Sequence, residues 1–449
     1  VINVSFNRPK FENGGRIDFE AGNYDLAHGT AVVNLAASDT LAFRAAVDYN
    51  YRGGYMTSGA DSKDDLSFRL SALYEPTNDF SAYIWGYYGT KNGSPANIVN
   101  KGTRASYNAA GQINGLTFDE PAFLTSNPWN DSYPALDPAF AALIGSASLA
   151  PFGQPTRPTQ NYENWAVGGE FKLDLSDDIT LTYIPGYVNL DATSNIYWLG
   201  NVPTFKDDHY RSTTHELRLS GEMGQLSWLA GAYAYHRVQF GKDIVGSSTG
   251  EFGAAIPFTP FPFYGSHVLR NRLQGVAAFG QATYEVSPGF KLTVGARYGT
   301  DSTKANGIAL DDQLSHSLGS PYSQGTPYTY DRSLSRFDYK IAAQYDLTPD
   351  IMVYAQYQTG YQPNTFNEVA DLPGRTNHVD PATLRALSGG FKARFFNDTL
   401  QINDEVFYSD YRNYQIQFYN ATKLYNPIIN AARVTIPGNQ LDIVWAPTR

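Results

Sequence analysis

The sequence predicts an all-β protein, a transmembrane antiparallel β-barrel with about 16 strands in this chain. Three observations lead to this fold class. Long segments alternate apolar and polar residues with a period of two, which is typical of β-strands. The turns between these segments are alternately very short and very long, as in outer-membrane barrels. The alternating segments run for roughly 10 to 16 residues, longer than the strands of most globular proteins and long enough to cross a bilayer.

The short turns recur along the whole chain and consist of residues that tolerate tight backbone conformations. Between consecutive turns there is room for two strands and one variable loop, so the unit is a hairpin whose ends differ in length. The seven turns lie at residues 38–40, 76–79, 176–178, 222–224, 287–289, 348–350 and 397–398.

The alternation is clearest next to these turns. After the first turn, the apolar residues from Leu41 to Tyr51 occupy odd positions, and Arg44 and Asp48 lie on the other face. Residues 290–298 and 337–346 repeat this pattern. Tyr49, Tyr51, Tyr298 and Tyr345 are expected near strand ends, where tyrosine rings form the interfacial girdles of membrane barrels.

The predicted strands begin near Arg16, Gly29, Leu41, Leu66, Phe80, Tyr162, Ile179, Ser212, Gln225, Leu273, Phe290, Arg336, Ile351, Leu384, Thr399 and Arg433. The long loops are then expected at residues 53–64, 89–161, 192–211, 240–270, 300–334, 361–383 and 419–432. A soluble multi-sheet protein is the alternative. Strand length and turn asymmetry favour the barrel, which leaves no unpaired strand edge in lipid.

Composition excludes several classes of protein. The chain has 33 Lys+Arg against 43 Asp+Glu and a net charge of −10, so we expect no nucleic-acid partner, which would require a basic face. It has no cysteine, which excludes disulfides and thiolate sites. No run of apolar residues is long enough for a membrane-spanning helix.

No catalytic or metal-binding constellation is recognisable, so we expect no enzyme, no metal site and no cofactor. The pair His215 and Glu216 suggests a zinc-protease helix, but that motif needs a second histidine where Leu219 stands. The alternation around Arg218 indicates a strand instead, with Glu216 and Arg218 facing a polar lumen.

Several segments, in order along the chain, carry a family resemblance. They are VINVSFNRP at 1–9, GNYD at 22–25, HELRLS at 215–220, LSWLAGAY at 226–233, VYAQYQTGYQP at 353–363, FN at 366–367, DPATL at 380–384, GFK at 390–392, FFNDTLQIN at 395–403 and FYSDY at 407–411. Together they resemble TonB-dependent receptors of the Gram-negative outer membrane. Two positions depart from the family pattern. Ser388 stands where a glutamate is usual, and Asp404 falls on the face that should contact lipid, which indicates a different local register or a position near the periplasmic rim.

The resemblance implies a domain organisation. Residues 1–10 look like the end of a plug domain and its linker, and residues 11–449 look like part of the barrel. Barrels of this family have about 22 strands and a plugged lumen, so the rest of the plug and the last strands are expected outside this chain. Taken alone, such an open sheet exposes two edges, so we expect this piece by itself to be inactive and prone to aggregation.

The resemblance also implies a function and partners. The expected function is TonB-energised uptake of a bulky, scarce solute across the outer membrane, an iron–siderophore complex above all. The expected partners are outer-membrane lipid, the TonB complex through the missing N-terminal region, and a small-molecule substrate such as a metal chelate. A passive porin-like channel and a receptor for carbohydrate or another nutrient are the alternatives.

Substrate binding is expected on extracellular loops rich in aromatic, amide and arginine side chains. The best-formed candidate set is Tyr361, Gln362, Asn364, Phe366, Asn367 and Arg375. A second cluster is Phe258, Phe261, Phe263 and Tyr264. For both sets, loop packing or membrane-girdle contacts are the alternative role.

Overall fold

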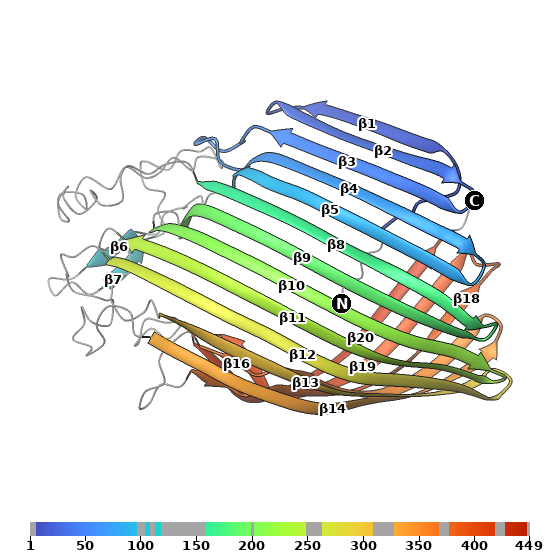
Figure 1. The fold of residues 1–449 in the computed structure, drawn as a ribbon. Coiled ribbons are helices and arrows are strands. Elements are labelled where there is room, and N and C mark those ends of the chain that lie inside the picture. Colours follow the sequence, from blue (N-terminus) through green and yellow to red (C-terminus); the bar gives the residue numbers. More distant parts are fainter. Residues whose placement is uncertain are drawn as a thin grey trace.

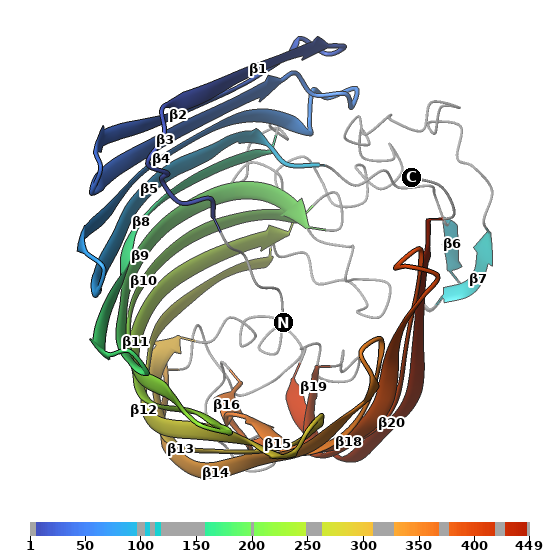
Figure 2. The ribbon, with the colours of Figure 1, turned by 90° about the vertical axis from the view of Figure 1, so that its right-hand side faces the viewer.

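The computed structural model describes residues 6–96, 104–107, 113–117, 158–198, 202–247, 263–308, 327–367, 377–417 and 427–446. These residues form one curved 16-stranded sheet and two small hairpins, and they contain no helix. Among them, therefore, no helix is long and apolar enough to cross a membrane. Figures 1 and 2 show the sheet as a curved wall with its strands in chain order, and its concave side is called the luminal face below.

The sheet confirms the predicted number of strands. Each strand pairs antiparallel with its neighbours in the order of the sequence. The strands are β1 (Gly14–Gly22), β2 (Leu26–Ser38), β3 (Leu41–Arg52), β4 (Ser62–Thr77), β5 (Phe80–Ser94), β8 (Thr159–Ser176), β9 (Ile179–Trp198), β10 (Val202–Met223), β11 (Leu226–Ser247), β12 (Phe263–Ser287), β13 (Phe290–Ile308), β14 (Pro327–Thr348), β15 (Ile351–Gln362), β18 (Ala382–Phe395), β19 (Leu400–Gln417) and β20 (Ile428–Trp445). The small hairpins are β6 (Arg104–Tyr107) with β7 (Ile113–Thr117), and β16 (Thr365–Phe366) with β17 (His378–Val379).

All seven predicted tight turns join neighbouring strands at one end of the wall. Two of them use a glycine in the left-handed region, Gly224 with φ 60° and Gly289 with φ 78°. The last turn places Phe396, Asn397 and Asp398 in that region as well. These local features fix the register of each hairpin, so the strands that follow a tight turn begin within one residue of the predicted position.

The strands that follow long loops begin earlier than predicted. β10 starts at Val202 and not near Ser212, β12 starts at Phe263 and not near Leu273, and β14 starts at Pro327. The predicted loop at 192–211 is therefore mostly strand. The physical reason is that both faces of a strand are wet beyond the membrane, so the apolar alternation that marks a strand disappears there.

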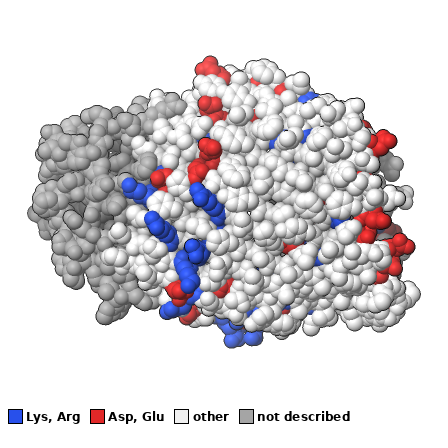
Figure 3. Space-filling model, viewed as in Figure 1, with Lys and Arg blue, Asp and Glu red and all other residues white. Residues whose placement is uncertain are grey.

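The outer and luminal faces differ as the alternation predicts. On β13 the outward Val294 and Tyr298 are 55% and 56% exposed, and the intervening Gly295 is buried on the concave face. Figure 3 shows this outer surface as a mostly uncharged band, with Lys and Arg gathered beside the long-loop end and Asp and Glu at the short-turn edge. Of the predicted girdle tyrosines, Tyr298 lies in the middle of β13 and not at its end, because β13 continues to Ile308.

Asp404 lies on the outward face, as its place in the alternation predicts. It pairs across the sheet with the exposed Leu441, and its Oδ1 accepts a hydrogen bond of 2.7 Å from Asn439 Nδ2. It is near the start of β19, close to the short-turn end. Of the two interpretations of Asp404, the structure therefore supports the second: β19 keeps the predicted alternation, and the carboxylate lies near the short-turn rim of the wall with a polar partner.

Candidate functional site on the luminal wall

The luminal face carries the polar side chains that the alternation assigns to it. On β10, Glu216 and Arg218 form an ion pair of 2.5 Å, while Leu217 between them is 47% exposed on the outer face. Farther along the wall, Tyr354 of β15 donates a hydrogen bond to Glu405 of β19, and Gln356 Nε2 donates one of 3.0 Å to Ser388. This inner wall can offer charged, amide and phenolic groups to a solute.

One luminal carboxylate is held by two tyrosines. Asp301 of β13 is only 7% exposed. Tyr235 of β11 donates to its Oδ1 at 2.7 Å, and Tyr361 of β15 donates to its Oδ2. Gly275 of β12 pairs with both Tyr235 and Asp301, and the absence of a side chain there lets them meet across it. We call Tyr235, Asp301 and Tyr361 the tyrosine–aspartate cluster.

Tyr361 reaches this cluster because β15 leaves β14. Pairing between the two strands stops at Lys340 and Gln358. Beyond that point Thr359 Oγ1 accepts a hydrogen bond from the backbone N–H of Tyr339 at 3.0 Å and donates one to Asp338 at 3.2 Å. Side chains thus replace the backbone ladder, and the end of β15 turns into the lumen.

The small hairpin of β16 and β17 follows directly, inside the curve of the wall (Figure 2). Asn364 Nδ2 donates to the hydroxyl of Tyr330 at 2.6 Å, and the Phe366 ring lies 5.1 Å from that of Tyr330. Asn367 bonds the backbone of Ile428 twice, at 2.7 and 3.0 Å. The hairpin is therefore fastened to β14 on one side and to β20 on the other.

The predicted binding residues divide into two groups. Asn364 and Phe366 are 8% and 9% exposed and pack in the hairpin, and Asn367 fastens it, which are the roles expected of loop packing. Tyr361 belongs to the tyrosine–aspartate cluster and Gln362 is exposed. Arg375 lies outside the described residues, as do Phe258 and Phe261. Phe263 and Tyr264 begin β12. A role in solute binding stays a prediction for all of them.

The N-terminal residues that the structure describes lie against the same inner wall. Arg69 of β4 stacks on the ring of Phe6 at 3.7 Å and on Trp85 at 4.6 Å. Arg8 pairs with Glu170 of β8 at 2.9 Å and lies 4.8 Å from the ring centre of Tyr83. These contacts hold residues 6–8 in the lumen.

A further group of aromatic and charged residues lies at the long-loop end of β1 to β3. Arg52 pairs with Asp61 at 3.2 Å and lies 4.6 Å from the ring centre of Tyr55, which meets Tyr24 edge-to-face at 6.0 Å. The hydrogen bond with Asp61 raises the pKa of Tyr55. The sequence analysis missed this group because its members come from two loops whose proximity depends on the pairing of β2 with β3.

In the part of the chain that the structure describes, there is no cluster of three or more His, Asp or Glu side chains that could hold a metal ion. The exposed ion pairs, such as Lys304 with Asp331 at 3.0 Å, are those of a solvated surface.

Comparison with known proteins agrees with this architecture. The family model described as "TonB dependent receptor-like, beta-barrel" matches residues 100–446. The ferric yersiniabactin uptake receptor FyuA from Yersinia pestis superposes with a TM-score of 0.71 at 14% identity, over 98% of this chain and 60% of that one. The siderophore receptor PiuA from Acinetobacter baumannii gives a TM-score of 0.67 at 16% identity, over 98% and 62%. The ferric-catecholate import receptor Fiu from E. coli K12 gives 0.63 at 15%, over 98% and 63%.

These likenesses concern the fold, and this chain spans about 60% of the length of the first of these receptors. The family model covers far more than half of the chain. Barrels of this kind lie in the outer membrane of Gram-negative bacteria, with short turns on the periplasmic side and long loops outside. The chain belongs to the family of TonB-dependent receptor-like β-barrels.

Proposed function

We propose that this chain supplies most of the barrel of a TonB-dependent outer-membrane receptor that imports a bulky, scarce solute, with an iron–siderophore complex as the substrate class. Residues 1–10 are then the end of the plug and its linker, and TonB acts on the plug. The solute enters from the long-loop end and meets the luminal wall.

One observation carries this proposal: a segment that precedes the first strand lies inside the lumen and is held there by Arg69 and Glu170. A passive porin needs an open channel, whereas a receptor needs its lumen filled. The three receptors named above are described as a ferric yersiniabactin uptake receptor, a siderophore receptor and a ferric-catecholate import receptor, and they support the same substrate class.

The test is uptake of radioactive iron by cells that carry or lack the gene containing this chain. Cells are grown without free iron and given one iron-loaded siderophore at a time, of catecholate, hydroxamate or mixed type. We expect uptake of at least one of them to require both the gene and TonB. Uptake that needs the gene but not TonB would instead support the porin alternative. TonB-dependent uptake of an oligosaccharide without iron uptake would support a nutrient receptor.

The luminal site is tested by two variants on one strand. Tyr361→Phe combined with Gln362→Ala should weaken solute binding by about three- to tenfold, the effect of losing one or two hydrogen bonds. Tyr357→Phe is the matched control, because Tyr357 lies on the outward face near Tyr339. Solute affinity is measured by titration of the purified receptor. Equal affinity in the wild type, the double variant and the control would show that Tyr361 and Gln362 do not belong to the site.

A further inference from the structure

Four arginines surround the tyrosine–aspartate cluster on the luminal face of β11 to β14. Arg237 of β11 and Arg332 of β14 belong to one row of paired residues that crosses β12 and β13. This row lies two residues beyond the cluster, on the side of the long loops. Arg297 of β13 and Arg336 of β14 lie on the side of the short turns. We call these four residues the arginine group.

The arginine group lacks anionic partners in the part of the chain that the structure describes. None of its four side chains forms an ion pair with a described Asp or Glu. Both oxygens of Asp301 instead accept the tyrosine hydroxyls. Arg332 Nη1 donates to the carbonyl of Asp331 at 3.1 Å. The Nε of Arg336 is buried without a hydrogen-bond partner among the described residues, which is unfavourable and indicates that an acceptor comes from outside this wall.

The spacing of the two upper arginines fits a bulky solute. Adjacent strands lie about 4.8 Å apart, so the backbones of Arg237 and Arg332, three strands apart, are separated by roughly 14 Å. Both side chains are exposed. Leu273 and Thr303 lie between them in the same row. Because the wall is concave here, the two guanidinium groups can contact one solute from two sides.

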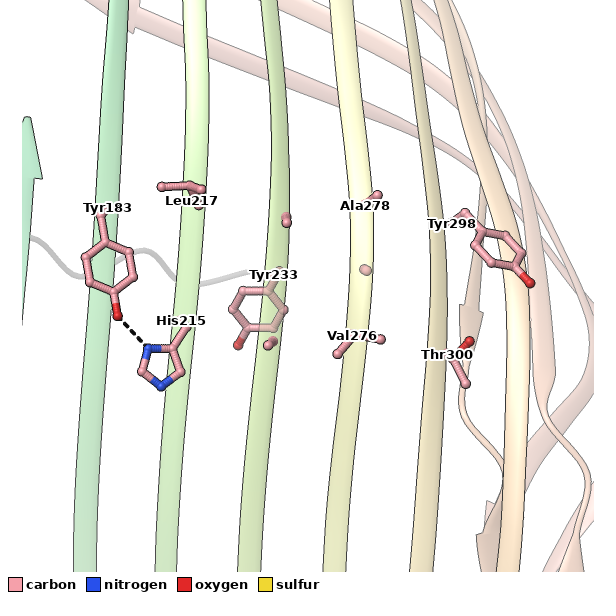
Figure 4. Close-up of a pocket in the computed structure, with 11 residues that line it drawn as sticks. Tyr183, His215, Leu217, Tyr233, Val276, Ala278, Tyr298 and Thr300 are labelled. Atoms are coloured by element: carbon pink, nitrogen blue, oxygen red, sulfur yellow. Dashed lines mark hydrogen bonds between the residues drawn. The ribbon is translucent and has the colours of Figure 1, made fainter. Parts of the chain in front are cut away.

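The outward face of the same strands differs in chemistry. Figure 4 shows a hollow of about 440 Å³ there, with Leu217, Val276 and Ala278 among its lining residues. Tyr183 and His215 share a hydrogen bond of 2.8 Å across one side of it. No Lys, Arg, Asp or Glu lines this hollow. At the level of the cluster, therefore, the cations are confined to the luminal face.

The strands across the lumen carry the opposite charge. In Figure 2, β1 to β3 lie on the other side of the curve from β12 to β14. There His28 contacts Asp48 at 2.8 Å and Glu20 at 3.7 Å, so two carboxylates gather around one histidine. Charges of opposite sign on facing walls produce a field across the lumen, and that field draws an anion toward the arginine group.

We propose that the arginine group binds anionic oxygens of the transported solute, so that the receptor selects iron chelates of net negative charge. The chelates would carry carboxylate or catecholate oxygens at their surface. Arg237 and Arg332, nearer the long loops, meet the solute first. A guanidinium group forms charge-assisted hydrogen bonds with such oxygens and binds a carboxylate bidentately. This inference rests on the proposed function and adds the sign of the solute charge to it.

The first experiment titrates the receptor, purified at its full genomic length in detergent, with three iron(III) chelates. They are an anionic tris-catecholate, an anionic hydroxycarboxylate complex and a neutral trihydroxamate. We expect one or both anionic chelates to bind about tenfold or more tightly than the neutral one, with an affinity that falls as salt is added. The anionic chelate that binds identifies the type of oxygen.

Two results of this titration would overturn the inference. One is binding of the neutral chelate as tight as that of the anionic ones, and the other is no binding of either anionic chelate. The uptake test above separates these results from failure of the importer function. TonB-dependent uptake of a neutral iron chelate would keep that function and reject the selection by charge.

Variants then locate the charge selection in the arginine group. R237Q/R332Q should lower the affinity for the anionic chelate about ten- to hundredfold, from the loss of two charge-assisted hydrogen bonds at exposed positions. Its affinity for the neutral chelate should stay as in the wild type. R237K/R332K keeps both charges and should restore part of the loss. The matched control R211Q/R272Q makes the same charge change on the outward face and should bind as the wild type does.

Retention of the compact band of the unheated protein on gels verifies that each variant folds. If R237Q/R332Q lost equal affinity for anionic and neutral chelates, or lost thermal stability without a change in charge preference, the arginines would be structural contacts. Either result would overturn the proposal.

Discussion

At the scale of single residues, Gly275 decides whether the tyrosine–aspartate cluster can form. A Cβ at this position would lie 2.6 Å from both Asp301 Oδ1 and a ring carbon of Tyr235. Gly295 on the neighbouring strand also lies on the luminal face, but the nearest atom to its Cβ would be 3.6 Å away. The two glycines therefore have different structural roles in the same wall.

This difference gives a prediction. Gly275→Val should destabilise the folded barrel by about 1–3 kcal/mol, because the side chain overpacks the wall and displaces Asp301 from Tyr235. Gly295→Ala should change stability by less than about 1 kcal/mol. Urea unfolding of the two detergent-solubilised variants, followed by tryptophan fluorescence, measures both values. Equal stability of the two would mean that the wall relaxes freely around Gly275.

The site was only partly predictable at this scale. Tyr361 was selected from its local motif, but Tyr235 and Asp301 lie far from it in the sequence and join it through the pairings of β11, β12 and β13. The tight turn at 287–289 sets the pairing of β12 with β13, but Asp301 falls in the segment 300–334 that the sequence predicts as a loop. The pairing of Tyr235 with Gly275 spans the long loop between β11 and β12, so no local pattern reveals it. Asn364 and Phe366 were selected by the same aromatic and amide signal, which does not distinguish a side chain that packs from one that binds.

At the scale of elements, the outward face of β13 at Val294 lies in the apolar band. On β12 the outward face becomes polar near Gln274, at the boundary of that band. Introducing one charge at each level should therefore have different effects. Val294→Lys should destabilise the barrel by about 2–4 kcal/mol, and Gln274→Lys by about 0–1 kcal/mol, because the penalty falls toward the interface. Unfolding from lipid vesicles provides the measurement, and a penalty at Gln274 as large as that at Val294 would place the interface farther along the strand.

The N-terminal segment is a second element whose attachment can be tested. Glu170→Gln removes the ion pair with Arg8, and Arg69→Ala removes the stacking on Phe6 and Trp85. Because Arg8 and Glu170 are partly exposed, their pair contributes no more than about 1 kcal/mol, and each cation–π contact adds about 0.5–2 kcal/mol.

The double variant should therefore loosen the segment without unfolding the barrel. A spin label at Asn7 should become more mobile in E170Q/R69A than in the control Lys172→Gln, which keeps the Arg8 pair. Identical spectra in the two variants would show that contacts other than these two hold the segment.

The sequence predicts the strand boundaries correctly at the short-turn end of the wall and poorly at the long-loop end. Leu41, Phe80, Ile179, Phe290 and Ile351 were predicted as strand starts and are strand starts, because each follows a tight turn with its own sequence signal. Beyond the apolar band the strands continue with polar residues on both faces, as in residues 206–209 of β10. Backbone hydrogen bonds maintain pairing there, and these carry no signature in side-chain polarity.

At the scale of the whole molecule, β1 and β20 are the two ends of the sheet and are not paired with each other. Ile17 and Phe19 on β1 are 82% and 75% exposed. Unpaired backbone groups in lipid are unfavourable, and such edges associate with other chains.

We therefore expect this chain, expressed alone, to form oligomers or aggregates in detergent, while the full-length gene product sediments as one species. Sedimentation velocity distinguishes the two. A monodisperse monomer of the chain alone, resistant to detergent below its unfolding temperature, would mean that β1 and β20 can pair.

The length of the strands has a consequence for the cell surface. β12 has 25 residues, a path of roughly 80 Å at about 3.3 Å per residue. Even at a tilt of about 45°, it rises roughly twice as high as the apolar band of about 25 Å. The long-loop end of the wall therefore projects well beyond the bilayer surface. Phages, antibodies and toxins approaching the cell would meet this end and its loops first, and a sheath of strands would separate them from the lipid.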